Sequence, residues 1–221
     1  TKWGDWYDKL LVNAMPFTVL TFLAVVVGGL IQIIPMLTIS RQLQTEDRIA
    51  RVYSPLELAG RDIYVREGCY TCHSQMIRPF RSETERYGEY SKVGEFIYDR
   101  PFQWGSKRTG PDLHRIGGKY PNAWHWKHMN EPRSTSPGSI MPSYGWMYTV
   151  DLDVSHTEGK ILTMQKLGVP YPDGFAAKAV ADLQAQAVAI AEDLGNAGIK
   201  NVDPKKEIVA MIAYLQRLGT D

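Results

Sequence analysis

The longest apolar stretch of the chain lies near its beginning. No charged residue occurs between Leu10 and Ser40, whereas the remainder of the sequence is polar and rich in glycine and proline. The 24 residues from Pro16 to Ile39 would rise about 36 Å as a helix, and a hydrocarbon core is about 30 Å thick. The pattern therefore predicts one transmembrane helix within an N-terminal segment, residues 1–40.

Two other interpretations of this stretch are weaker. A cleaved signal peptide has a shorter apolar region, about 7–15 residues, followed by a small-residue cleavage site, and no such site precedes Arg41. A buried helix of a soluble protein rarely reaches this length. Trp3, Trp6 and Tyr7 precede the stretch, and such residues gather where a helix enters the headgroup layer. We expect a retained single-span anchor in the lipid bilayer.

One face of the expected helix carries small and polar residues. Gly28 and Gln32 lie one turn apart on a stripe that also contains Thr21, Val25 and Met36. Small residues let a second helix approach closely, and an amide in hydrocarbon requires a hydrogen-bonding partner. The stripe predicts docking onto another membrane subunit.

A linker at 41–53 and a domain at 54–221 are expected to follow the anchor. Ser54 and Glu57 form a capping box with Pro55 at the first helical position, which predicts a helix of about twelve residues. A last helix should begin at Asp203-Pro204 and stop at Gly219, with one apolar face: Ile208, Met211, Ile212, Leu215 and Leu218. We expect the two helices to cross, with Gly60 at the contact.

The intervening sequence has less regular patterning. Residues 74–126 show no sustained helical or strand period, so an irregular segment is expected. Residues 151–201 would form an insertion containing a helical run from Phe175 to Leu194. The formal net charge of +1 gives no reason to expect a nucleic-acid partner.

The most specific motif is the segment 69–73, Cys-Tyr-Thr-Cys-His, which holds both cysteines of the chain. Cys-x-x-Cys-His is the attachment signature of a c-type haem: Cys69 and Cys72 would bond to the vinyl groups, and His73 would ligate the iron. A thioredoxin-like redox pair would need a βαβ context. A zinc site would need further ligands, which His125 and His128 could supply by count.

The sixth iron ligand and the support of His73 have several candidates. Met141 is set between two prolines, Pro137 and Pro142, and His/Met ligation raises the redox potential, as suits an electron relay. Bis-histidine ligation would use one of four other histidines: His114, His125, His128 or His156. An iron-bound histidine usually donates its second N–H to a fixed acceptor. The Pro111 carbonyl could be that acceptor, and a simple turn is an equal alternative.

With these motifs in view, the chain resembles the membrane-anchored mono-haem cytochrome c subunit of cbb3-type cytochrome c oxidases. The resemblance covers nearly the whole length and is most specific in three segments, residues 68–79, 98–113 and 139–144. It implies a mainly α fold of the class I cytochrome c type and one covalent haem c. It also implies Cys69 and Cys72 as thioether anchors, with His73 and Met141 as axial ligands.

The resemblance implies a function and partners as well. Electrons would pass from a donor cytochrome through this haem to a haem–copper catalytic membrane subunit that reduces oxygen, beside a dihaem cytochrome c subunit. The haem domain would lie in the periplasm at a bacterial inner membrane. Arg78, Arg81 and Arg86 could pair with haem propionates or with an acidic partner surface. The alternatives are the anchored cytochrome c subunit of nitric oxide reductase and a free-standing tethered shuttle.

Overall fold

The computed structural model describes residues 2–42, 50–105 and 107–220 and divides into two compact units, Thr1–Glu46 and Asp47–Asp221. The described residues are mainly helical and contain no strand, apart from one isolated bridge between Asp151 and Lys206. The expected mainly α fold is confirmed. Most of the expected linker, residues 43–49, lies outside the described residues.

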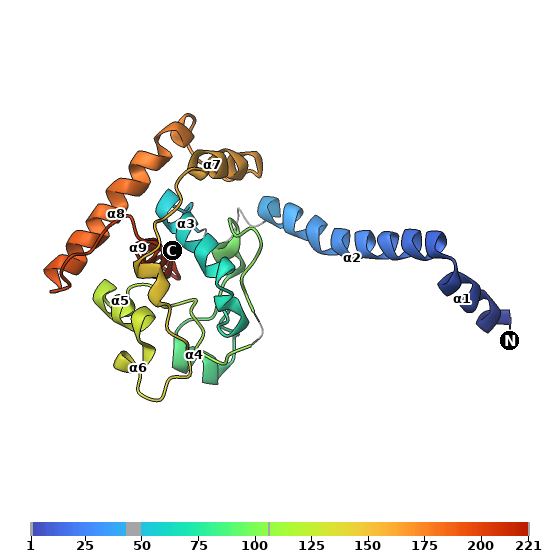
Figure 1. Ribbon diagram of the computed structural model, residues 1–221, viewed down its shortest axis with the longest axis horizontal. Helices are drawn as coiled ribbons and strands as arrows, with labels where there is room; N and C mark the ends of the chain where they lie inside the picture. The colour runs from blue at the N-terminus through green and yellow to red at the C-terminus, as the bar shows by residue number, and fades with distance from the viewer. Residues whose placement is uncertain (1, 43–49, 106, 221) are drawn as a thin grey trace. The chain divides into compact units, whose positions relative to one another are not determined.

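The N-terminal unit consists of two helices, α1 (Lys2–Val12) and α2 (Ala14–Gln42) (Figure 1). Helix α2 contains a candidate membrane span, Ala14–Pro35, of 22 residues and mean hydropathy 2.4, none of it buried. The predicted apolar helix is confirmed and extends slightly at both ends. The helical conformation of α1 was not predicted. In the predicted stripe, Gly28 and Gln32 are exposed. The side chain of Met36 is not among the described parts of the chain.

Helix α3 (Pro55–Arg66) begins with the predicted capping box. The Ser54 hydroxyl accepts a hydrogen bond from the Glu57 N–H at 3.3 Å, and the Glu57 carboxylate accepts one from the Ser54 N–H at 2.8 Å. The Ser54 and Glu57 N–H groups, which have no partner within the helix, are thereby satisfied. The predicted start and length of the helix are confirmed.

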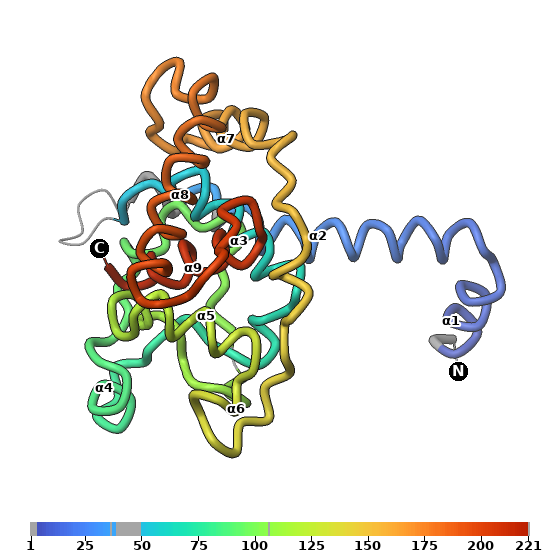
Figure 2. Tube along the Cα trace, turned by 60° about the vertical axis from the view of Figure 1, so that its left-hand side comes forward, coloured from blue at the N-terminus to red at the C-terminus, as the bar shows by residue number. Residues whose placement is uncertain are grey.

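Helix α9 (Glu207–Arg217) crosses α3 at Gly60 (Figures 1 and 2). A Cβ atom at position 60 would lie 1.9 Å from the Ala210 carbonyl oxygen and 2.8 Å from the Tyr214 Cβ. Only glycine allows so close an approach of two backbones. The predicted crossing is confirmed, and apolar side chains of both helices are fully buried around it: Leu56, Ile208, Met211 and Ile212.

The predicted start of α9 at Asp203-Pro204 was wrong by three residues. The Asp203 carboxylate caps a turn instead, accepting from the Lys205 N–H at 3.0 Å. The next residues are held extended, because the Leu152 N–H donates to the Lys205 carbonyl at 2.7 Å and the Glu207 N–H donates to the Val150 carbonyl at 3.2 Å. This pairing across the expected insertion boundary delays the helix to Glu207.

The segment 151–201 forms two helices, α7 (Thr157–Lys166) and α8 (Ala179–Asn196). Both contact α3, and α8 also contacts α9, with α7 and α8 in orange at the outer edge of Figure 1. The predicted helical run is confirmed, although Phe175–Lys178 forms a 3-10 turn before α8. Helix α7 was not predicted.

The segment 74–126 is largely without regular structure, as expected, but it is not wholly irregular. It contains the short helix α4 (Arg81–Tyr87), a 3-10 turn at Val93–Phe96 and the start of α5 (Asn122–Asn130). Helix α6 (Pro132–Thr135) follows directly. Helix α5 contacts α8 and α9, and Figure 2 shows it beside α9.

Candidate functional site

The Cys-x-x-Cys-His segment follows α3 after a left-handed turn. Gly68 has φ 70°, and Cys69–Thr71 then form a 3-10 turn. The His73 N–H donates to the Cys69 carbonyl at 3.0 Å, so this turn brings the backbone of His73 back beside the first cysteine. Both thiols are free; Cys69 is buried and Cys72 is exposed. Burial raises the pKa of Cys69 to about 12, so this thiol is protonated at neutral pH.

His73 is held from behind by a tight loop. Its Nδ1 lies 2.8 Å from the Pro111 carbonyl oxygen, and because a carbonyl can only accept, Nδ1 carries the proton. A Cβ at Gly110 would lie 2.2 Å from the His73 Cε1 atom, so only glycine leaves room for the ring. Burial lowers the pKa of His73, although the Pro111 contact opposes this. The imidazole is therefore neutral, with Nε2 available to a metal.

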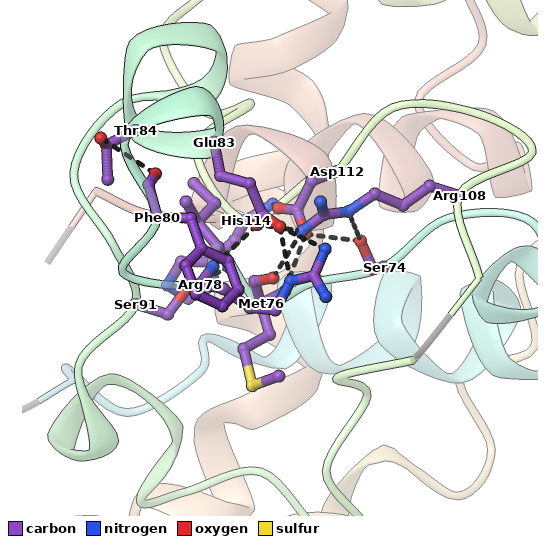
Figure 3. Close-up of polar contacts among 11 residues, drawn as sticks. Ser74, Met76, Arg78, Phe80, Glu83, Thr84, Ser91, Arg108, Asp112 and His114 are labelled. Carbon is purple, nitrogen blue, oxygen red and sulfur yellow. Dashed lines mark hydrogen bonds and ion pairs between the residues drawn. The ribbon is translucent and has the colours of Figure 1, made fainter.

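The loop behind His73 is tied to the signature by its backbone and by one buried carboxylate. The Gly110 N–H donates to the Cys72 carbonyl at 3.0 Å, and the Leu113 N–H donates to the Ser74 carbonyl at 2.8 Å. The Asp112 carboxylate accepts from the Ser74 hydroxyl at 2.6 Å, the Met76 N–H at 2.9 Å and the His114 N–H at 2.8 Å (Figure 3). These bonds fix the position of the Pro111 carbonyl.

A second buried carboxylate extends this network outward. Glu83 of α4 accepts from the Arg108 guanidinium at 2.7 Å and is ion-paired with Arg78. The hydrogen bond from Arg108 is the main reason that the pKa of Glu83 falls to about 2, with Arg78 adding to the effect against burial. Arg108 also donates to the Ser74 hydroxyl at 2.7 Å and to the Met76 carbonyl at 2.9 Å. The arginine thus joins α4 to the signature (Figure 3).

The segment containing Met141 lies beside the same cysteines. The Tyr144 N–H donates to the Met129 carbonyl of α5 at 2.9 Å, and Met141 packs half-buried against the core. The pKa of Tyr144 is raised to about 12, mainly by burial and next by the neighbouring Cys69 and Cys72 thiols. The structure therefore brings the Met141 segment and the signature together.

The four remaining histidines have different surroundings. Burial lowers the pKa of His128, and neighbouring His73 lowers it further, so His128 belongs to the same region. His125 is buried on α5, and its pKa falls to about 4. His114 contacts Glu95 at 3.0 Å, and His156 is exposed next to α7. Within the described ranges, no group of three or more His, Cys, Asp or Glu side chains has an arrangement that could hold a metal ion.

The residues fit a haem iron by their donor chemistry. One neutral imidazole is fixed through Nδ1, two free thiols lie within a turn of it, and a thioether segment packs beside them. The fold and this site define a mainly helical domain with a haem-attachment signature, in a chain that also carries one helix long enough to span a membrane.

A family model described as cytochrome C oxidase, mono-heme subunit/FixO matches residues 7–221. The chain belongs to this family. It is therefore a mono-haem subunit of a cytochrome c oxidase, which implies a single haem and an oxidase catalytic partner. No curated protein gives a significant match to the chain.

The polar network behind His73 was not found from the sequence. Asp112 directly follows Pro111, and only the Pro111 carbonyl was predicted to contact His73. Glu83 and Arg108 are charged residues in a segment without period, and such residues are usually solvated. The available signal was a carboxylate placed directly after the proline, since short acidic side chains often bond to neighbouring backbone amides.

Proposed function

We propose that this chain relays electrons, one at a time, from a donor cytochrome to the haem–copper catalytic subunit that reduces oxygen. The observation that carries the proposal is the fixed, neutral His73, with its Nδ1–H on the Pro111 carbonyl and its other ring nitrogen left for iron. A bound haem iron supplies reversible one-electron chemistry between its ferric and ferrous states. The rigid loop keeps the ligand in one position, which favours transfer with little rearrangement.

We propose covalent attachment of haem c through Cys69 and Cys72. The left-handed turn at Gly68 and the following 3-10 turn keep both cysteines within one turn of His73. The test is haem staining of the chain after denaturing electrophoresis. We expect a stained band that survives acid–acetone extraction and is lost in the double variant Cys69→Ala, Cys72→Ala. A native chain that releases all its haem on extraction would contradict the proposal.

We propose Met141 as the sixth ligand, opposite His73. A Met141→His variant should keep its haem but lose the sulfur-to-iron absorption at the red edge of the spectrum, and its midpoint potential should fall by about 100 mV or more. His128 is the second candidate, because its pKa responds to His73. His128→Ala is therefore the matched control. A spectrum altered by His128→Ala and unaltered by Met141→His would assign the ligand to the histidine.

We propose that the chain is a single-pass protein of the bacterial inner membrane, with residues 1–40 as the anchor segment, 41–53 as the linker and 54–221 as a periplasmic domain whose insertion is about 151–201. Its partners would be the haem–copper subunit and a dihaem cytochrome c subunit. Protease added to spheroplasts should degrade the haem domain and leave the anchor. A domain protected until the membrane is opened would contradict this orientation.

We propose that the stripe at Gly28 and Gln32 contacts a partner helix in the membrane. Both positions are exposed on α2, and a Cβ at Gly28 would meet nothing within 4 Å, so a larger side chain there does not disturb this chain. The double variant Gly28→Leu, Gln32→Leu should reduce co-purification of the catalytic subunit severalfold. Gly29→Leu, on another side of the helix, is the control and should leave it unchanged. Equal recovery with both variants would contradict the proposal.

A further inference from the structure

A cleft of about 420 Å³ opens directly behind the loop that holds His73. Its walls come from α4 and from the segments before and after it. The lining comprises Arg78, Ser82, Glu83, Arg86, Tyr87, Arg108, Thr109, Gly110 and Pro111. We call it the arginine cleft. Gly110 and Pro111 thus form one wall of the cleft on one side and the support of the His73 ring on the other.

The arginine cleft carries excess positive charge. Three arginines line it against one glutamate, and the buried Asp112 carboxylate lies 3.4 Å from Arg108, so these groups together carry a net charge of +1. Glu83 is occupied by Arg78 and Arg108. Arg86 is exposed and forms no ion pair with any described residue; its guanidinium lies 5.2 Å from the centroid of the Tyr87 ring. A fixed cation without a counter-ion at the mouth of a polar cleft suits a carboxylate from another molecule.

The cations are already in position. The Arg108 guanidinium lies 5.2 Å from the Tyr87 centroid and is held by hydrogen bonds to Ser74 and Met76. One aromatic ring therefore orders two guanidinium groups, Arg86 and Arg108. Pre-ordered donors lose less side-chain entropy when an anion binds. The rim is exposed and polar, as in transient contacts steered by charge, whereas stable subunit interfaces are more apolar.

We propose that the arginine cleft is a docking site for an acidic surface on a redox partner protein. The inference rests on the proposed function, because the wall formed by Pro111 is what couples the cleft to the haem site. A carboxylate seated against Pro111 lies on the far side of the loop whose carbonyl receives the His73 N–H. A partner docked there lies close to His73, the proposed iron ligand. Only Pro111 and the hydrogen bond from the His73 ring to its carbonyl separate the two.

Arg81 provides a matched control on the same helix. Its side chain is 90% exposed, it pairs with Glu85 at 2.7 Å, and it is absent from the cleft lining. Arg81→Glu and Arg86→Glu change the net charge of the chain equally, so only their positions relative to the cleft differ.

The first experiment measures binding of fluorescent poly-L-glutamate, as a probe of acidic protein surfaces, to the purified oxidase in detergent. At low ionic strength, Arg86→Glu should weaken binding about tenfold, and Arg81→Glu by less than about twofold. Salt should weaken binding to the native protein most, because it screens exposed charges. Equal weakening by both variants would overturn the proposal, as would stronger competition by anionic phospholipid vesicles than by poly-L-glutamate.

The second experiment follows haem reduction by stopped flow with anionic ascorbate and with neutral hydroquinone. Arg86→Glu should slow reduction by ascorbate about threefold or more and leave hydroquinone unaffected; an unchanged ascorbate rate would overturn the proposal. A shifted midpoint potential or lost haem in Arg86→Glu, with unchanged poly-L-glutamate binding, would assign the arginines to the haem propionates instead. A native chain without covalent haem would refute the proposed function, while the binding experiment would still report on the cleft.

Discussion

The two sides of the haem domain are held together by different forces. Around the crossing of α3 and α9, most buried side chains are apolar and the backbones touch at Gly60, although Glu57, Arg61, Glu207 and Arg217 are also buried on these helices. Behind His73, by contrast, the loop 108–114 is fixed by the carboxylates of Asp112 and Glu83 and by the hydrogen bonds that they accept. Apolar burial is tolerant of direction, whereas hydrogen bonds are directional. The directional bonds are found where the Pro111 carbonyl must meet the Nδ1–H group of His73.

The difference also sets how each side should fail. A steric error at the crossing separates two helices and opens the whole core, which is costly throughout the domain. A lost hydrogen bond behind His73 leaves a buried donor without a partner, at about 1–3 kcal/mol, and the damage should remain near the site. Three substitutions test this contrast.

The largest effect is expected for Gly60→Ala. The added Cβ would lie 1.9 Å from the Ala210 carbonyl oxygen, and backbone atoms cannot yield without moving α9. We expect a loss of about 3 kcal/mol or more in the free energy of unfolding, measured by denaturant unfolding of the detergent-purified chain.

Gly159→Ala is the control for that prediction. Gly159 lies in α7, and a Cβ there meets nothing within 4 Å, so the better helix propensity of alanine should stabilise the chain by about 0.5–1 kcal/mol. Similar destabilisation by both substitutions would show that the close contact at Gly60 is not what limits stability.

An intermediate effect is expected for Asp112→Asn. The amide would turn a donor toward groups that are themselves donors, the Ser74 hydroxyl and the Met76 and His114 amides. We expect a loss of about 2 kcal/mol together with a changed haem midpoint potential, because the Pro111 carbonyl loses its support. Exposed Asp173→Asn should change stability by less than about 0.5 kcal/mol. An Asp112→Asn variant that is destabilised but keeps the native midpoint potential would show that the hydrogen bonds of Asp112 do not affect His73.

The smallest effect concerns Glu83 and pH. Hydrogen bonding from Arg108 holds the pKa of Glu83 near 2, below its ordinary value of 4.5. A depressed acid pKa stabilises the fold above the ordinary value, and this stabilisation is lost as pH falls from about 4.5 toward 2. Glu83→Gln should therefore cost about 1 kcal/mol at pH 7, since the exposed Arg78 partner is screened.

The pH dependence is read from thermal unfolding between pH 7 and pH 3. The native chain should lose more stability over this range than Glu83→Gln, and the difference between the two should shrink as the pH falls below about 4.5. Glu158→Gln, exposed on α7, should follow the native curve. Parallel curves for the native chain and Glu83→Gln would exclude Glu83 as an acid-sensitive group.

The apolar side of the domain was predictable from the sequence. The capping box at Ser54, the periodic face of the last helix and the contact at Gly60 are each determined by local patterns or by one residue type. The start of α9 could not be predicted, because its delay to Glu207 depends on pairing with Val150 and Leu152, which lie more than fifty residues earlier. Local cap signals were outweighed by that long-range contact.

Much less of the polar side could be predicted from the sequence. The signature and the Pro111 carbonyl could be proposed from the sequence because their chemistry has a fixed spacing. Glu83 and Arg108 have no such spacing: they are 25 residues apart and come within 2.7 Å only in the folded chain. Helix α7 was missed for a similar reason, since its buried residues include Thr157 and Met164 beside Ile161 and give a weak apolar period.

The α3–α9 contact joins residues about 150 positions apart, so the helix before the signature gains its main partner only when nearly the whole domain has been made. Until then the first cysteine has no cover from the C-terminal end of the chain. A chain cut before α9 would therefore lack the partner of α3 and leave Cys69 without this cover.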